Sequence, residues 1–284
     1  MRSRKIADRE VSEIGLGCWQ IGADWGEVDH EVALGILRSA YQSGITMFDT
    51  ADIYGAGRSE QLLGEFLRTL DTPVFVASKL GRSDSPGWPD NFTSGVMQKH
   101  LEGSLGRLGL EQLDLLQLHC PPSEVLADGT VFQHLRLLRD QGLIRGFGAS
   151  VETIEQALLC LEQDDLTSLQ IIFNLFRHQP RERLFELAAA RGVALIVRLP
   201  LASGMLAGGY TPETVFAADD HRTYNRDGEA FNVGETFSGL PFDKGLEIVE
   251  SLRPLVPEGM TMADLAQRWI LDHPAVTTVI TGAS

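Results

Sequence analysis

Short apolar runs alternate with longer segments of helical periodicity along almost the whole chain. Between the runs, apolar side chains recur three or four positions apart, as on one face of an α-helix. Strands that read as continuous apolar runs are buried on both faces, so the alternation predicts a parallel sheet covered by helices. The predicted strands span residues 14–18, 45–49, 74–79, 113–119, 146–150, 169–173, 194–200 and 277–280.

Eight such strands with helical crossovers predict an α/β fold whose sheet closes into a (β/α)8 TIM barrel. A chain of 284 residues suits one barrel, and we expect a single domain over 1–284. The residues before Ile14 indicate a β-hairpin that turns at Asp8-Arg9 and plugs the bottom of the barrel.

Two further features depart from a plain barrel. The segment 202–243, after the seventh strand, is long and rich in glycine and charge, which is typical of a functional lid or a disordered linker. Its aromatic residues favour a packed lid: Tyr210, Phe216, Tyr224, Phe231 and Phe237. The sequence stops at Ser284, directly after the eighth strand, so we expect the final helix to be missing.

Two helix starts are legible. Ser59 precedes a run of apolar residues at helical spacing, so we expect it to cap that helix. Thr261 and Asp264 resemble a capping box with Asp in the place of Glu, which predicts a helix beginning there.

Composition narrows the functional classes. The chain has 24 basic and 39 acidic side chains and a net charge of −15, which argues against a nucleic-acid partner. The N-terminal segment is charged and no apolar run is long enough to cross a bilayer, so we expect a cytoplasmic protein with no membrane partner. Cys18, Cys120 and Cys160 are widely spaced and lack a CxxC pair, which predicts neither disulfides nor a metal site.

Three successive predicted strands end in ionisable side chains. They are Asp49, Lys79 and His119, and Tyr54 follows Asp49 by five residues in a glycine-bounded loop. The active site of a parallel barrel lies at the carboxyl ends of its strands, so these four side chains are expected to gather there.

Together they form a proton-donating set. The pKa of a free tyrosine is about 10, and a neighbouring ammonium such as that of Lys79 should lower it. A carboxylate, here Asp49, must then offset the charge of the buried lysine, and His119 could orient a carbonyl oxygen toward Tyr54. The set would protonate a C=O group while a cofactor delivers a hydride.

Each residue alone has an ordinary interpretation. The aspartate could be a turn residue, the tyrosine a packing residue and the histidine a structural one. Lys79 could also be the Schiff-base nucleophile of a lyase. Their joint position on consecutive strand ends favours the catalytic interpretation.

The arrangement resembles the aldo-keto reductase family. The matching stretches are 44–55, Arg58-Ser59-Glu60, Ser78-Lys79, 104–109, 114–119 and 142–150. The resemblance implies a barrel that binds NADP(H), with NAD(H) possible, at the strand ends, and a tetrad of Asp49, Tyr54, Lys79 and His119 with Tyr54 as general acid. The first strand is followed by no GxGxxG motif, so a Rossmann domain is not expected.

The same resemblance implies which residues surround the cofactor and the substrate. Ser150 and Gln170 are expected to bind the nicotinamide carboxamide. The other expected cofactor contacts are Gly17, Cys18, Trp19, Asp49, Arg198, Pro200, Leu201, Ser203, Gly204, Gly282, Ala283 and Ser284. The expected substrate contacts are Trp19, Trp25, Tyr54, Trp88 and His119.

One of these positions departs from the family. Arg198 stands where an aromatic ring normally stacks on the nicotinamide. Its guanidinium plane could stack instead and favour the reduced cofactor, or it could pair with an acidic loop residue or a substrate carboxylate.

The resulting functional hypothesis is an NADP(H)-dependent oxidoreductase that interconverts aldehydes or ketones, sugars among them, and alcohols. We expect a monomer or weak homo-oligomer whose partner is a small-molecule carbonyl or alcohol. The alternative is a regulatory member of the same family, similar to the potassium-channel β subunits, that binds nucleotide with little turnover.

Overall fold

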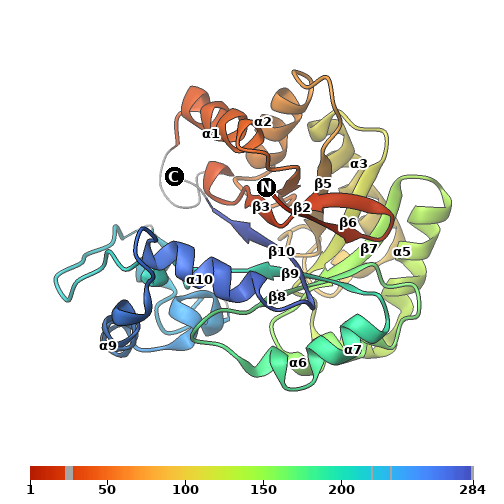
Figure 1. Ribbon diagram of the computed structural model, residues 1–284. Helices are drawn as coiled ribbons and strands as arrows, with labels where there is room; N and C mark the ends of the chain where they lie inside the picture. Colours follow the sequence, from red (N-terminus) through yellow and green to blue (C-terminus); the bar gives the residue numbers. More distant parts are fainter. Residues whose placement is uncertain (23–27, 219, 231, 283–284) are drawn as a thin grey trace.

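The computed structural model describes residues 1–22, 28–218, 220–230 and 232–282. Within these residues, eight parallel strands form a closed barrel in the order β10-β3-β4-β5-β6-β7-β8-β9 (Figure 1). The strands are β3 (Ile14–Gly17), β4 (Met47–Asp49), β5 (Phe75–Leu80), β6 (Leu113–His119), β7 (Ile144–Ser150), β8 (Ser168–Ile172), β9 (Ala194–Arg198) and β10 (Val276–Thr281). The predicted (β/α)8 barrel is confirmed, and each predicted strand has its counterpart.

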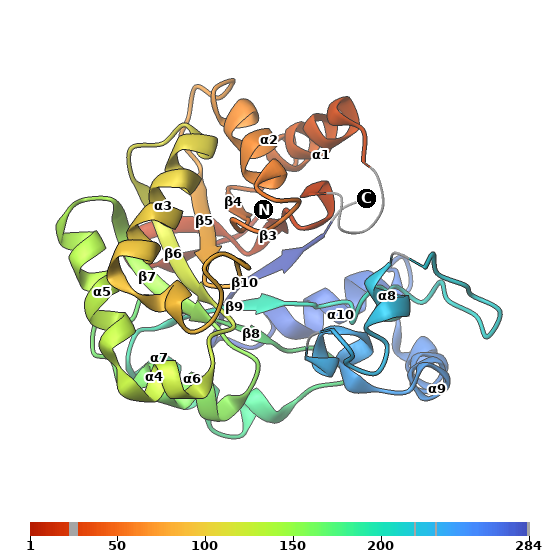
Figure 2. The same cartoon turned by 180° about the vertical axis from the view of Figure 1, so that it is seen from behind.

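Helices cover the outside of the barrel, as the two opposite views show (Figures 1 and 2). The α-helices are α1 (His30–Gln42), α2 (Arg58–Leu67), α3 (Ser94–Leu108), α4 (Ser123–Asp128), α5 (Thr130–Asp140), α6 (Ile154–Leu161), α7 (Leu184–Ala190), α8 (His221–Tyr224), α9 (Phe242–Leu252) and α10 (Met262–Leu271). Short 3-10 turns are η1 (Gln20–Gly22), η2 (Asp90–Phe92), η3 (Gln179–Arg181), η4 (Met205–Ala207), η5 (Val233–Glu235), η6 (Phe237–Gly239) and η7 (Arg253–Leu255). The apolar sides of the helices and the outward-facing strand residues form the largest core cluster.

The expected hairpin closes one end of the barrel. Strands β1 (Ser3–Ile6) and β2 (Arg9–Ser12) pair antiparallel. Ile6 and Val11 are buried and join a cluster with residues of the barrel interior such as Met47 and Ile196. The hairpin therefore seals the barrel at the end opposite the polar strand tips.

The two predicted helix starts have different outcomes. Thr261 caps α10, and its reciprocal hydrogen bonds with Asp264 confirm the capping box. Ser59 does not cap α2, since Gly57 holds the N-cap position. The Ser59 hydroxyl is fully buried and donates instead to the carbonyl of Cys18 at 2.7 Å, because tertiary packing places that acceptor beside it.

The long segment after β9 folds against the barrel as a packed lid. Its 3-10 turns η4 and η6 carry Met205, Leu206 and Phe237 into a separate apolar cluster, completed by α9 and α10. Of the aromatics expected to pack, Tyr210, Phe216 and Phe237 contact one another, Tyr224 is 39% exposed, and Phe231 lies outside the described residues. The segment is thus anchored by its own small core, and Figure 2 shows it beside α9 and α10.

We expect Ile6→Ala to lower the free energy of unfolding by about 3 kcal/mol, because it leaves a cavity beneath the barrel. Equilibrium urea unfolding measures this change. Val215→Ala, at a position that is 89% exposed, is the control and should change stability by less than about 0.5 kcal/mol. An equally small effect at Ile6 would mean that the hairpin does not close a shared core.

Candidate active site

The inward face of the barrel changes from apolar to polar along several strands. In β5 the inward residues run Phe75, Ala77, Lys79, and the first two lie in the hairpin-side cluster while Lys79 is at the other end. Met47 and Asp49 repeat the change in β4. The period of two along a strand thus brings the polar residues into one layer at the carboxyl ends.

Lys79 is the centre of this layer and is fully buried. Its ammonium donates to Asp49 Oδ1, to the carbonyl oxygen of Thr50 at 2.9 Å and to Tyr54 Oη at 3.4 Å. An ammonium has three hydrogens, so each one has an acceptor. The charge is buried without an unmet donor.

The carboxylate of Asp49 is held from its other side by two amides. Gln117 Nε2 donates to Asp49 Oδ2 at 3.0 Å, and Gln170 Nε2 donates to the same oxygen at 2.8 Å. Ser150 Oγ in turn donates to Gln170 Oε1 at 3.3 Å. The ion pair therefore belongs to a network that extends across β4 to β8.

The pKa values differ from the sequence-based expectation at Tyr54. Burial raises the pKa of Tyr54 to about 12, and the ammonium of Lys79 offsets only part of that effect. The expected lowering of this pKa is therefore wrong for the free protein, because desolvation of the phenolate outweighs the nearby cation. Burial also acts to lower the pKa of Lys79, but Asp49 and Tyr54 reverse it and the net pKa is raised. The protein holds a neutral phenol beside a charged lysine.

The loop that carries Tyr54 is fixed against the loop that follows β3. Gly55 has φ 58°, and a Cβ there would lie 2.0 Å from the carbonyl oxygen of Gly22, so only glycine fits this contact. Arg58 Nη2 donates to the carbonyl of Val28 at 2.5 Å. With the bond from Ser59 to Cys18, these contacts join the two loops.

The rings of His119 and Trp19 flank the phenol. His119 meets Tyr54 edge-on, with ring centroids 5.7 Å apart and an interplanar angle of 86°. Trp19 stacks on the other side at 6.0 Å and 24°. Burial holds the pKa of His119 well below its usual value, and its Nδ1 has no hydrogen-bond partner among the described residues. His119 is therefore a neutral imidazole at physiological pH.

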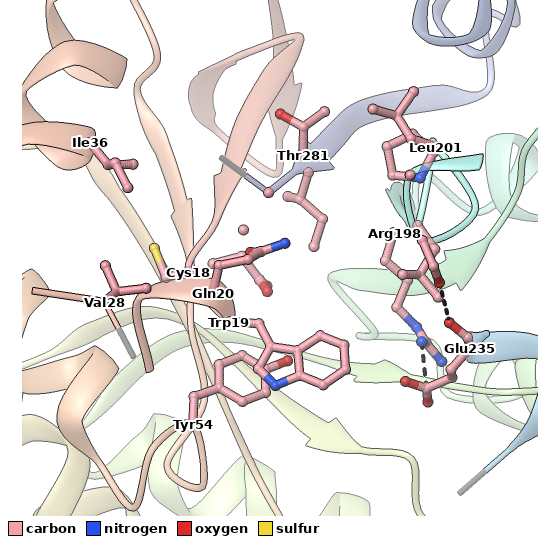
Figure 3. Close-up of a pocket in the computed structure, with 18 of the residues that line it drawn as sticks. Cys18, Trp19, Gln20, Val28, Ile36, Tyr54, Arg198, Leu201, Glu235 and Thr281 are labelled. Atoms are coloured by element: carbon pink, nitrogen blue, oxygen red, sulfur yellow. Dashed lines mark hydrogen bonds and ion pairs between the residues drawn. The ribbon is translucent and has the colours of Figure 1, made fainter. Parts of the chain in front are cut away.

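A cavity of about 680 Å³ opens above these groups. Fourteen predicted residues line it: Gly17, Cys18, Trp19, Asp49, Tyr54, His119, Ser150, Gln170, Arg198, Pro200, Leu201, Ser203, Gly204 and Gly282. Lys79 lies behind Asp49 and Tyr54. Figure 3 shows Trp19 and Tyr54 on one side of the cavity and Arg198 and Leu201 on the other.

Four further predicted site residues have other outcomes. Trp88 is 58% exposed and is not among the described residues that line it. Trp25, Ala283 and Ser284 lie outside the described residues.

The guanidinium of Arg198 is paired with the lid. Its Nη1 lies 3.3 Å from Glu235 Oε1, and its Nη2 donates to the carbonyl of Val151 at 3.4 Å. Of the three expected roles, pairing with an acidic loop residue is observed. Glu235 also approaches Cys120 and Glu152, whose possible ligand atoms all lie within 4.8 Å of one another. The guanidinium on Glu235 disfavours a cation at this cluster.

Comparison with known proteins identifies the family. The family model described as aldo/keto reductase family matches residues 13–284. The chain belongs to the aldo/keto reductase family.

Two further comparisons concern individual proteins of known sequence or structure. Aldo-keto reductase YhdN of Bacillus subtilis is 31% identical over 295 residues, which cover 100% of this chain and 85% of that protein. The structure of a glycerol dehydrogenase from Gluconobacter oxydans is 27% identical with a TM-score of 0.81, covering 99% of this chain and 86% of that one.

An aldo/keto reductase from Klebsiella pneumoniae, solved in complex with NADP and acetate, shares the fold. Its TM-score is 0.70 at 22% identity, covering 98% of this chain and 83% of that one.

The helices of the present chain were also compared with the length and hydropathy that a membrane span requires. Within its described residues, none meets both requirements.

Sequence reasoning missed several residues of this reductase's site. Gln117 could have been found, because it lies two positions before His119 and so shares its face of the strand. Gln20, Tyr210, Arg222 and Glu235 also line the cavity. The last three come from the lid, whose path no periodicity in the sequence predicts.

The lid touches the opposite side of the site through His221. Its ring lies 5.3 Å from that of Trp19, and burial lowers the pKa of His221 to about 4. Below its ordinary pKa of about 6.5 the unfolded chain binds a proton at this imidazole, while the folded protein stays unprotonated until about pH 4. Stability therefore falls as the pH decreases.

We expect this histidine to account for about 2 kcal/mol of lost unfolding free energy between pH 8 and pH 5. His221→Gln should flatten the profile by that amount in urea unfolding at the two pH values. His30→Gln is the control, and its effect on the pH profile should have the opposite sign. Glu65 raises the pKa of exposed His30, so removal of this histidine should make the fall in stability at low pH steeper. An unaltered profile in His221→Gln would contradict the assignment.

Proposed function

We propose that this aldo-keto reductase is an NADP(H)-dependent enzyme that interconverts carbonyl compounds and alcohols, with Tyr54 as general acid and base. The observation that carries the proposal is the 3.4 Å contact between Lys79 Nζ and Tyr54 Oη at the wall of the cavity. A phenol beside a buried ammonium can release its proton when negative charge develops on a neighbouring oxygen.

The residues around the cavity fit a nicotinamide dinucleotide. Ser150 and Gln170 offer a hydroxyl and an amide next to Asp49, which suits the carboxamide of nicotinamide. Gly17 and Gly204 bring backbone to the cavity wall, and Arg222 adds a guanidinium suited to a phosphate. NADP(H), when bound, supplies or accepts the hydride. The Klebsiella structure bound to NADP supports this choice.

The protein's own contribution is to polarise the carbonyl and transfer a proton. Neutral His119 and Tyr54 hold the carbonyl oxygen between them, and Tyr54 Oη gives its hydrogen to that oxygen as the alcohol forms. Lys79 stabilises the phenolate that remains, and Asp49 keeps Lys79 charged. In alcohol oxidation the proton returns to Tyr54. Because the pKa of free Tyr54 is about 12, the phenol is fully protonated at neutral pH, which is the form that reduction needs.

Three free cysteines among the described residues are consistent with the cytoplasmic location we propose.

We expect Tyr54→Phe to lower kcat for aldehyde reduction about 10³-fold, because the proton donor is removed. NADPH affinity should stay within about twofold, since the ring that stacks on Trp19 remains. NADPH oxidation followed at steady state, with a fluorescence titration of NADPH, measures both quantities. Tyr41→Phe, on α1 against Phe66, is the matched control and should keep full activity.

Two results would count against this assignment. Retained activity in Tyr54→Phe would refute the general acid. NADPH binding by the wild-type protein without turnover of any aldehyde or ketone would favour the regulatory alternative.

Nucleotide choice is tested by titrating the protein with NADPH and NADH. We expect NADPH to bind more tightly than NADH. Arg222→Gln should weaken the affinity for NADPH about tenfold and leave kcat unchanged, because one charge-assisted contact to phosphate is lost. The guanidinium is held ready by Asp220 and by Tyr210, whose hydroxyl accepts from Nη1 at 2.6 Å. Tighter binding of NADH would make NAD(H) the cofactor and leave the reductase chemistry intact.

A further inference from the structure

A further ionisable pair lies behind the loop that carries Tyr54. Asp52 stands midway between Thr50 and Tyr54 on this loop, and its side chain is only 7% exposed. Its backbone N–H donates to the carbonyl oxygen of Lys79 at 3.2 Å, which ties the loop to the end of β5. Neither Asp52 nor its neighbour His100, on α3, is among the described residues that line the cavity. Any effect of this pair on the reaction therefore passes through the loop.

The carboxyl group of Asp52 and the imidazole of His100 face each other across a short gap. His100 Nδ1 lies 3.7 Å from Asp52 Oδ2, which is within ion-pair range but too long for a hydrogen bond. Asp52 Oδ1 and His100 Nδ1 are buried and have no hydrogen-bond partner among the described residues. Unmet polar atoms in the interior are costly, and one proton between the two side chains would give each of them a partner.

The charges that face Asp52 leave it without a counter-ion of its own. Glu60, from α2, is fully buried and repels the carboxylate, and Arg107, from α3, is already paired with Glu60 through Nε and Oε2 at 2.7 Å. The ammonium of Lys79 also acts on Asp52, but its charge is offset by Asp49. An ionised Asp52 is thus an unbalanced negative charge in the interior, and one bound proton removes it.

Asp52 rather than His100 carries this proton. Burial raises the pKa of Asp52 to about 7. Burial lowers the pKa of His100, and Lys99 and Arg107 act in the same direction, so the imidazole is neutral. Its ring hydrogen-bonds to the backbone of Ser85, in the loop after β5, and a neutral imidazole has one donor and one acceptor. The unpartnered Nδ1 is therefore the acceptor, and a protonated carboxyl group is the donor that matches it.

We propose that the Asp52–His100 pair positions Tyr54: while the pair holds its proton, the loop after β4 stays packed against α3, and loss of the proton displaces the phenol. Without the proton, repulsion by Glu60 favours a loop position in which the carboxylate reaches water. Only two residues separate Asp52 from Tyr54, and a misplacement of about 1 Å can slow a reaction about 100-fold. This inference rests on the proposed reductase function and adds two positioning residues to it.

The pH dependence of a single turnover tests this role. The protein with bound NADPH is mixed with excess propanal between pH 6 and pH 9, and the loss of NADPH fluorescence gives the rate constant. We expect the wild-type rate constant to fall at least about tenfold over this range. Asp52→Asn keeps the shape of the protonated carboxyl group and cannot ionise, so its rate constant should stay within about twofold throughout.

Further variants separate positioning from a general structural role, which would change the rate constant by the same factor at every pH. His100→Gln offers an amide that can donate to the carboxylate, so the fall in rate should move to lower pH. Asp52→Asn should bind NADPH within about twofold of wild type, because the side chain does not line the cavity. Asp84→Asn, at an exposed aspartate of the loop after β5, is the matched control and should keep the wild-type profile.

The outcomes are distinct. A wild-type rate constant that changes less than about twofold between pH 6 and pH 9, or an unaltered fall in Asp52→Asn, would overturn the positioning role while the reductase function stands. If the wild-type protein with bound NADPH reduces no aldehyde or ketone at any pH, the proposed function fails and this inference with it. The wild-type and His100→Gln profiles test the inference even if Asp52→Asn does not fold.

Discussion

The charge of Lys79, buried without access to water, is the constraint on which the rest of the site depends. An ammonium in the protein interior is stable only when its counter-charge and all its hydrogen bonds are supplied by the fold. Asp49, Thr50 and Tyr54 supply them here, and two glutamines then fix Asp49. The phenol of Tyr54 is therefore held in place by the same hydrogen bond that helps to stabilise the buried ammonium of Lys79. The contact on which the proposed chemistry depends is also one that the stability of the site requires.

The barrel makes such a burial possible by dividing its interior into two layers. Among the described residues, apolar side chains and the hairpin fill the end below the polar layer. The other end opens into the cavity. The proposed proton transfer would thus take place at a site whose dielectric surroundings are set by protein atoms.

Much of this arrangement could be predicted because the sequence of each strand determines where its side chains lie. A strand end fixes both the depth and the direction of its last side chain, so Asp49, Lys79 and His119 were placed from their positions alone. Ser59 was misassigned because a serine before a helix has the same local signature whether it caps that helix or bonds to a distant carbonyl. Glu235 could not be placed, since its contact with Arg198 depends on the route of a segment held by aromatic packing rather than by regular strands. The pKa of Tyr54 was misjudged for a similar reason: the sequence shows the cation nearby but not how much water the fold removes.

The contacts that join the loops after β3 and β4 affect which side of the cavity can move. Gly22 and Gly55 in close contact, together with Arg58 and Ser59, make that side of the cavity one stiff block. The facing side is formed by the lid, the long segment after β9. The lid contacts the first side through side chains, such as the ring of His221 against that of Trp19. A molecule as large as a dinucleotide would then be admitted by movement of the lid rather than of the loops after β3 and β4. Tyr54, the proposed proton donor, lies on the loop after β4, so its alignment would not depend on the position of the lid.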